Sequence, residues 1–222
     1  MRRLDIDCAD GLLRSFLKKL HLLPGQRFGD RVKSWDVLHT LRFISEHLDH
    51  MEPVLDLGAY ASEILPALNC SGFSSLTGID FNPDLKKMPD AGKIRYITGN
   101  FYESDLLAES FSAITAISVI EHGFDSNRLL SEVSRLLRPG GYFIASIDYW
   151  SEKIDTGGIK AFGLDWMIFS REDIQKCLDE AKKYGLVPMG EMDFETDQAP
   201  IRWLGKSYTF AWFVLKKTET PI

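Results

Sequence analysis

Short apolar segments alternate with helical patterns between residues 53 and 147. Strand-helix repetition of this kind predicts right-handed crossovers and a doubly wound, mostly parallel sheet, which is a Rossmann-like α/β fold. The apolar segments have the length and composition of buried strands, and they are 54–57, 76–79, 94–98, 112–120 and 142–147. The helical patterns between them lie at about 62–69, 83–88, 104–108 and 125–141.

The longest helical pattern, which begins at Asp125, places apolar side chains on one face. We expect the following residues to face the core: Leu129, Leu130, Val133, Leu136 and Leu137. Pro139-Gly140-Gly141 comes next, and because proline cannot continue a helix, we expect this tripeptide to stop it.

The alternation of strand and helix patterns ends after residue 147. The segment 148–170 is rich in glycine and aromatic residues and reads as an insertion, and Ser170 with Asp173 forms a capping box that opens the next helix. Two strand-like runs, 186–194 and 207–217, then follow each other without a helix between them. Strands joined in this way pair antiparallel, so we expect a seven-stranded sheet with an antiparallel C-terminal edge.

The N-terminal part has a different character. We expect helices at about 9–22 and from Ser34 onward, with Ser34 as the N-cap of the second. We therefore divide the chain into an N-terminal helical appendage over 1–50 and a main domain over 51–222, which includes a substrate-side loop at 149–169.

Composition narrows the partners and the compartment. The net charge of −6 disfavours nucleic acid, although the first 35 residues hold eight Lys or Arg against four Asp. No run of about 18 apolar residues occurs, so we expect no membrane insertion. Three widely spaced cysteines fit no metal pattern and indicate reduced thiols, hence a cytoplasmic protein. A homodimer is left open.

Polar residues stand where the expected strands end, which is where open parallel sheets bind ligands. The most informative is Asp80, because it follows Gly58 by 22 residues and ends an apolar strand. A carboxylate at this spacing can accept hydrogen bonds from the two hydroxyls of a ribose. The alternative is a solvated aspartate that begins the turn 80–84. The other strand-end residues are Asp56, Asn100, Ser118, Glu121, His122 and Asp148.

The series "VLDLGAYAS", "LTGID", "ITGN", "FSAITAISVIEH" and "RLLRPGGYFIAS", over about residues 53–147, resembles the motif series of class I S-adenosylmethionine-dependent methyltransferases that act on small molecules. The resemblance implies S-adenosylmethionine as the cofactor, a turn from Asp56 to Gly58 at its methionine end, Asp80 on its ribose, and Asn100 with Phe101 near its adenine. The cofactor-binding residues that we expect on this basis are Asp56, Gly58, Ala59, Tyr60, Asp80, Phe81, Asn100, Phe101 and Ser118.

The glycine turn departs from the family pattern, because Tyr60 and Ser62 replace its second and third glycines. A dinucleotide needs close backbone approach for its pyrophosphate, so these changes argue against a nicotinamide cofactor. S-adenosylmethionine has no phosphate and tolerates a side chain that points away. A second hypothesis stays open, in which the altered turn marks a catalytically weakened, methyltransferase-like binding protein.

Two residues are candidates for a catalytic base. His122 follows the fourth strand, where the methyl acceptor would lie, although its ring could also just satisfy a backbone carbonyl; Asp148 is the second candidate. Some relatives bind a metal through Glu-x-x-Glu-His, but Ser118 replaces the first Glu, so we expect no metal.

The function that we expect is methylation of a small molecule, most plausibly at an oxygen of a polar or sugar-like acceptor. In-line methyl transfer needs alignment and exclusion of water more than a set of catalytic side chains. The aromatic residues of the 149–169 loop could close over the acceptor as a lid, and they are Tyr149, Trp150, Phe162, Trp166 and Phe169. Alternatively, Trp166, Ile168 and Phe169 only dock the loop on the core.

Overall fold

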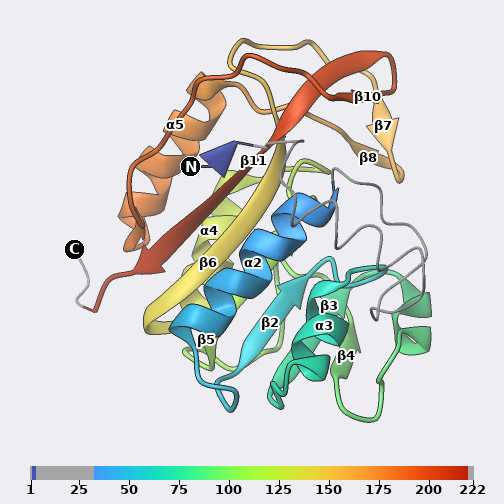
Figure 1. Cartoon of the computed structure of the whole chain (residues 1–222), viewed down its shortest axis with the longest axis vertical. Helices are drawn as coiled ribbons and strands as arrows, with labels where there is room; N and C mark the ends of the chain where they lie inside the picture. The colour runs from blue at the N-terminus through green and yellow to red at the C-terminus, as the bar shows by residue number, and fades with distance from the viewer. Residues whose placement is uncertain (1, 4–32, 220–222) are drawn as a thin grey trace.

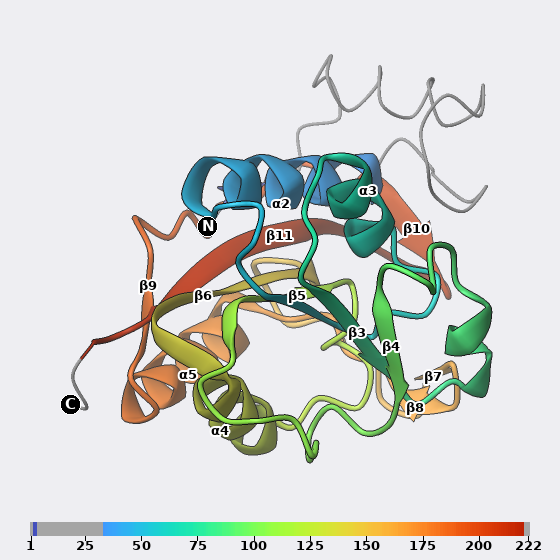
Figure 2. The ribbon, with the colours of Figure 1, turned by 90° about the horizontal axis from the view of Figure 1, so that it is seen from below.

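The computed structural model describes residues 2–3 and 33–219 as three layers (Figure 1). A central sheet carries α2 and α3 on one face and α4 and α5 on the other, as the view from below shows (Figure 2). The helices are α2 (Lys33–His47), α3 (Ile64–Cys70), the 3-10 helix η1 (Pro83–Lys87), α4 (Ser126–Leu136) and α5 (Arg171–Lys183). This is the doubly wound Rossmann-like fold that the alternation predicts.

The sheet has the strand order β1-β11-β6-β5-β2-β3-β4, and β9 and β10 also pair with β11. Its strands are β1 (Arg2–Arg3), β2 (Val54–Leu57), β3 (Leu76–Asp80), β4 (Arg95–Thr98), β5 (Phe111–Ile117), β6 (Leu137–Tyr149), β9 (Leu186–Pro188), β10 (Ile201–Trp203) and β11 (Lys206–Lys217). The strands β2 to β6 are parallel, whereas β11 is antiparallel to β6 and to its other neighbours. The predicted antiparallel C-terminal edge is therefore confirmed.

All seven predicted strands are present, but the sheet has nine strands among the described residues because the two short strands β1 and β10 join it. The predicted strand at 186–194 is wrong in length, since β9 ends at Pro188. Proline has no amide hydrogen to donate to a ladder, which fits the end of a strand. A small separate hairpin, β7 (Lys160–Ala161) with β8 (Leu164–Asp165), lies in the insertion after β6.

Two apolar cores lie on opposite faces of the sheet, because successive side chains of a strand point to opposite faces. On β5, Ile114 belongs to the core shared with α4 and α5, and Ala113 belongs to the core shared with α2 and α3. The leucines and the valine predicted to face inward on α4 are all buried. The amphipathic pattern of this helix thus identified its packed face correctly.

The helix expected at 104–108 is wrong, because that segment is an irregular connection between β4 and β5. The Arg135 guanidinium takes the carbonyl oxygens of Ser104 and Leu106, at 3.0 and 2.8 Å, which a helix would have used internally. Glu132 in turn accepts hydrogen bonds from the amide and the hydroxyl of Ser104. A partly buried ion pair on α4 therefore takes backbone groups of this segment.

The predicted role of Pro139-Gly140-Gly141 as the helix stop is also wrong. Helix α4 already ends at Leu136, and the tripeptide belongs to the long strand β6. Gly141 has little space for a side chain, because an added Cβ would lie 3.0 Å from the carbonyl oxygens of Arg138 and Ser112. The irregular pairing of β6 with β5 at Phe111 explains why small residues occur here.

Helix α2 begins one residue before the predicted N-cap Ser34 and packs on the sheet, where the hydroxyl of Thr40 accepts a 3.0 Å hydrogen bond from Trp212 Nε1. The helix expected at 9–22 lies outside the described residues. The capping box at Ser170 and Asp173 is confirmed, with both of its hydrogen bonds present.

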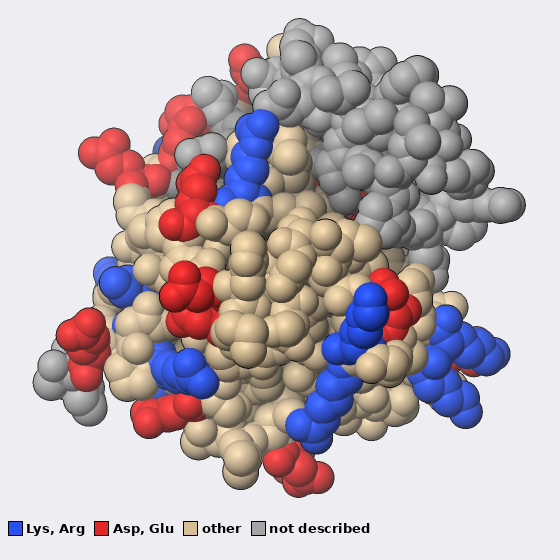
Figure 3. All heavy atoms as spheres, turned by 60° about the horizontal axis from the view of Figure 1, so that its bottom comes forward, with Lys and Arg blue, Asp and Glu red and all other residues tan. Residues whose placement is uncertain are grey.

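No helix among the described residues is long and apolar enough to cross a bilayer. On the face that Figure 3 shows, the described Lys and Arg side chains are interspersed with Asp and Glu.

Candidate functional site

The turn after β2 depends on glycine at one position. Gly58 has φ +66°, and a Cβ added there would lie 2.6 and 2.7 Å from the two Cγ atoms of Val119, just after β5. Both the backbone conformation and the missing side chain are therefore required. The turn after β2 and the end of β5 are in direct contact at this point.

Asp80 lies at the end of β3 and joins two loops. Its Oδ2 accepts a hydrogen bond from the Tyr60 amide at 3.0 Å, and its Oδ1 accepts one from the Asn82 amide at 2.8 Å. A carboxylate offers about four lone-pair sites, so acceptor capacity remains on both oxygens. Asp80 is only 7% exposed, whereas the Tyr60 side chain is 39% exposed. The hydrogen bond from Tyr60 to Asp80 thus comes from its backbone amide, and the residue itself is partly exposed.

Gly78, in the middle of β3, is a second glycine that close packing demands, and the sequence analysis missed it. A Cβ there would lie 2.7 Å from the Cβ of Ala59 and 2.9 Å from Leu65 Cδ1. Its signal was available, because a glycine inside an apolar strand marks a close approach. This glycine lets the cofactor turn and α3 settle against β3.

Asp56 is a buried carboxylate with one oxygen unused. Its Oδ1 accepts a 2.6 Å hydrogen bond from the Thr115 hydroxyl, whereas Oδ2 accepts none from any described residue. Burial raises the pKa of this carboxyl from 3.8 to about 6, the hydroxyls of Ser62 and Thr115 oppose the rise, and the nearby Asp80 charge adds to it. The site thus contains a buried carboxylate oxygen, Oδ2, to which no described residue donates a hydrogen bond within normal geometry.

We expect Asp56→Asn to stabilise the free protein at pH 8 and to have no such effect near pH 4. The folded-state pKa of about 6 exceeds the ordinary 3.8, so ionised Asp56 costs stability above pH 6, and the cost disappears as the pH falls toward 4. The rise corresponds to about 3 kcal/mol, from which the unpaired amide of Asn subtracts, leaving a gain of about 1–2 kcal/mol.

Urea unfolding at pH 8, 6 and 4.5 measures this gain. The exposed Asp105→Asn is the matched control, and its stability should follow the wild type at each pH. A gain for Asp56→Asn that is equal at all three values would contradict the assignment.

The remaining predicted cofactor residues lie at the same strand ends. Ala59 is buried and its amide donates to the Ile79 carbonyl at 3.2 Å, and Phe81 is exposed. Asn100 is exposed, with its Oδ1 accepting from the Tyr102 amide at 3.0 Å, while the Phe101 ring lies in the core. Ser118 directly follows β5 and has φ +55°, an uncommon value for a residue other than glycine.

Aromatic rings surround His122. Phe162, at the β7–β8 turn, lies edge-on to the imidazole with ring centroids 5.2 Å apart, and Trp203 of β10 lies 6.4 Å away. Phe162 is 77% exposed. Trp203 was missed by the sequence analysis, because only the pairing of β10 with β11 brings it over the insertion. The cluster forms an aromatic wall beside the candidate base.

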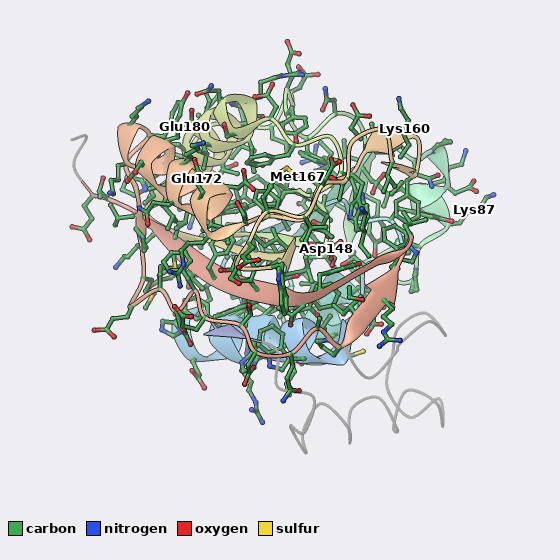
Figure 4. The ribbon with its side chains drawn as sticks, turned by 90° about the horizontal axis from the view of Figure 1, so that it is seen from above. Lys87, Asp148, Lys160, Met167, Glu172 and Glu180 are labelled. Atoms are coloured by element: carbon green, nitrogen blue, oxygen red, sulfur yellow. The ribbon has the colours of Figure 1, made fainter. Side chains whose placement is uncertain are left out.

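Asp148 anchors the insertion after β6. Its buried carboxylate accepts a 2.8 Å hydrogen bond from Trp166 Nε1, and its carbonyl accepts one from the Phe169 amide at 2.9 Å. Figure 4 looks down on this end of the sheet, with Asp148 near the centre and Met167 close by. Trp166 and Phe169 are buried, so they dock the loop, and Phe162 is the ring left exposed.

An open pocket of about 860 Å³ lies away from these residues, beside the start of α5. Its cations are already paired, Arg171 with Glu195 and Lys153 with Asp173. The strand ends therefore remain the better site, because they hold the unused acceptor of Asp56. Within residues 2–3 and 33–219, no three His, Cys, Asp or Glu side chains gather closely enough to hold a metal ion.

Comparison with known families gives a match over the central part of the chain. Residues 55–145 match the family model of a methyltransferase domain, and this range contains Asp56, Gly58, Asp80 and His122. Over this range the chain is similar to methyltransferase domains, and its fold is that of solved S-adenosylmethionine-dependent methyltransferases. S-adenosylmethionine is the cofactor that methyltransferases of this fold use, and the strand order of the chain and the position of its glycine turn are compatible with that cofactor.

Individual relatives are distant. The chain is 26% identical over 170 residues to a sterol 24-C-methyltransferase of Debaryomyces hansenii, a match that spans 70% of this chain but only 43% of the relative's length. Among solved structures, geranyl diphosphate C-methyltransferase from Streptomyces coelicolor A3(2), crystallised with S-adenosyl-L-homocysteine, has a TM-score of 0.63 at 14% identity, covering 82% of this chain and 77% of the other.

A further similar structure is a methyltransferase from Methanosarcina mazei, with a TM-score of 0.59 at 16% identity, covering 79% of this chain and 97% of the other. At these identities the structural likeness establishes the fold. The similarity does not assign the substrates of these relatives to this chain.

Proposed function

We propose that this protein transfers a methyl group from S-adenosylmethionine to a small molecule. The observation that carries the proposal is Asp80, a nearly buried carboxylate at the end of β3 with acceptor capacity left on both oxygens. Two neighbouring hydroxyls of a ribose are the donors that this geometry suits.

The residues of the chain fit the other parts of the cofactor. Asp56 Oδ2 is a buried acceptor without a donor, and the α-ammonium of the methionine end supplies one together with the compensating charge. The Gly58 turn lets the backbone approach the methionine end of the cofactor. Asn100 and Phe101 follow β4, which is the neighbour of β3 on the side away from β2, and we assign them to the adenine. An ammonium bound at Asp56 favours ionised carboxylate, so cofactor affinity should rise as the pH increases through about 6.

The acceptor site that we propose is the aromatic wall around His122. When bound, S-adenosylmethionine supplies an electrophilic methyl group on its sulfonium. An acceptor hydroxyl would be held against Phe162 and Trp203, and His122 would take its proton as the new carbon–oxygen bond forms and the methyl–sulfur bond breaks, which leaves S-adenosylhomocysteine. A polar or sugar-like acceptor suits this wall, because sugar rings have an apolar face that packs on aromatic rings.

Asp148 fits a base less well than His122. It is 4% exposed and its carboxylate holds Trp166 Nε1, so its contribution is to anchor the loop that carries Phe162. Closure of the 149–169 loop over the acceptor stays a prediction, as do a homodimer, a cytoplasmic location and the exclusion of nucleic acid.

The competing function is that of a methyltransferase-like binding protein with little turnover. The replacement of two glycines of the family turn by Tyr60 and Ser62 suggests this alternative. The exposed position of Tyr60 favours the enzyme, because the backbone amide of this residue, rather than its ring, contacts Asp80.

Titration calorimetry with S-adenosylmethionine and S-adenosylhomocysteine tests the proposed function. We expect wild-type binding and, for Tyr60→Gly, an affinity within about threefold of it, because the substitution keeps the backbone amide that holds Asp80. No binding at high micromolar concentration would refute the proposal. A Tyr60→Gly protein that binds about tenfold more tightly would instead favour the weakened binding protein.

A further inference from the structure

A buried polar path runs from helix α2 to the end of β5. Asp36, in the first turn of α2, is 1% exposed, and its Oδ2 accepts a 2.7 Å hydrogen bond from the Ser146 hydroxyl of β6. The Ser146 oxygen accepts a 3.0 Å hydrogen bond from the Ser118 amide, whose other acceptor is the Ser146 carbonyl at 3.1 Å. The path joins residues 110 and 28 positions apart in the sequence.

The path ends at the cofactor turn. Ser118 holds a positive φ of 55°, and the next residue, Val119, is the one that leaves no room for a side chain at Gly58. An uncommon backbone conformation persists only when its surroundings determine it. Here the two hydrogen bonds from the Ser118 amide to Ser146 supply that determination, and the Asp36 carboxylate fixes which way the Ser146 hydroxyl points.

A role at the start of helix α2 explains only one of the two carboxylate oxygens of Asp36. Its Oδ1 accepts from the neighbouring Val37 amide at 2.7 Å, as acidic residues in a first helical turn often do. The other oxygen is aimed away from the helix into the sheet, in a wholly buried position where a charge is costly unless it is hydrogen-bonded. Burial of a carboxylate between α2 and β6 adds nothing to the helix itself.

We propose that Asp36 is a positioning residue for the cofactor turn, and that it acts through Ser146 on Ser118 and thereby on Val119 and Gly58. The inference rests on the proposed function, since it concerns the same cofactor site. It assigns to helix α2, which lies before the methyltransferase-domain match at 55–145, a part in cofactor binding.

The test compares affinity for S-adenosylhomocysteine with thermal stability in four variants: Asp36→Asn, Ser146→Ala, both together, and Thr40→Val. Thr40 is the matched control, because it lies one turn further along α2, is equally buried, accepts from Trp212 and donates only to the backbone carbonyl of Asp36, at 2.8 Å, and not to the carboxylate that holds Ser146. We expect each relay variant to bind about tenfold more weakly and the double variant no more weakly than either one. Thr40→Val should lower the melting temperature but bind within about twofold of wild type.

A readout specific to the relay is the backbone amide resonance of Ser118. It should shift in Ser146→Ala and Asp36→Asn and stay in place in Thr40→Val. If Asp36→Asn fails to fold, Ser146→Ala, which removes one hydroxyl group, decides the question. Unchanged affinity in Ser146→Ala, additive losses in the double variant, or an equal loss in Thr40→Val would overturn the proposal.

The two proposals fail differently. Wild-type protein that binds no S-adenosylhomocysteine overturns the proposed function and the relay with it. Wild-type binding with unchanged variants overturns the relay alone.

Discussion

Replacing Asp80 by Ala is expected to weaken S-adenosylmethionine binding by about 100-fold or more. The ribose of the cofactor would lose the two charge-assisted hydrogen bonds that its hydroxyls donate to the carboxylate, and each of them contributes about 1.5–3 kcal/mol. The same change removes the acceptor of the Tyr60 and Asn82 amides, so the turns on both sides of the pocket lose their common anchor. Calorimetry with the cofactor measures the loss directly.

Two further proteins make this result specific. Asp84→Ala removes a half-exposed carboxylate four residues on, which pairs with Lys87 at 2.7 Å, and its affinity should stay near the wild-type value. Asp80→Asn keeps the shape but turns a donor toward one of the two amides, so we expect at least about tenfold weaker binding. Full affinity in Asp80→Asn would show that the charge has no part in recognition.

The second large effect is expected from Gly58→Ala. The new Cβ would lie 2.6 and 2.7 Å from the Cγ atoms of Val119, and the residue would have to keep φ +66°. Steric overlap and the left-handed backbone together should lower the free energy of unfolding by about 2–4 kcal/mol. Cofactor affinity should fall at least about tenfold, because the turn must move to relieve the overlap. Urea unfolding and calorimetry measure the two effects.

A second substitution separates overlap from backbone strain. Val119→Ala removes both Cγ atoms and leaves a Cβ 3.2 Å away, so Gly58→Ala with Val119→Ala should recover part of the lost stability. The strain at φ +66° would remain. Gly92→Ala is the matched control, since an added Cβ there meets nothing within 4 Å. No recovery in the double variant would place the whole cost on the backbone.

The cofactor half of the site was predictable from local patterns. Asp56, Gly58 and Asp80 each end an apolar strand, and in a parallel sheet such ends meet at one edge whatever the details of packing. The acceptor half was less accessible. Trp203 reaches His122 only because β10 folds back on β11, and a pairing between distant segments leaves no signal in a short window of sequence.

Local errors have a similar cause. The segment 104–108 has a helical pattern, but Arg135 and Glu132 of α4 take its backbone groups, and the sequence around Ser104 carries no sign of them. Pro139-Gly140-Gly141 looks like a helix stop, yet α4 ends before it because Leu137 already pairs with Phe111 of β5. Tertiary contacts overrode local preference in both places.

The sequence by itself determined the layered α/β fold, the antiparallel edge and the strand-end positions of Asp56, Asp80 and His122, because hydrophobic periodicity and strand order depend on residues close together in the chain. Only the tertiary structure decided that Asp56 keeps an unused buried oxygen, that Val119 closes on Gly58, and that Asp36 reaches Ser118 through Ser146. These properties depend on burial and on differences of a few tenths of an ångström in the distances between segments far apart in sequence. Only the packing of the folded chain sets those distances.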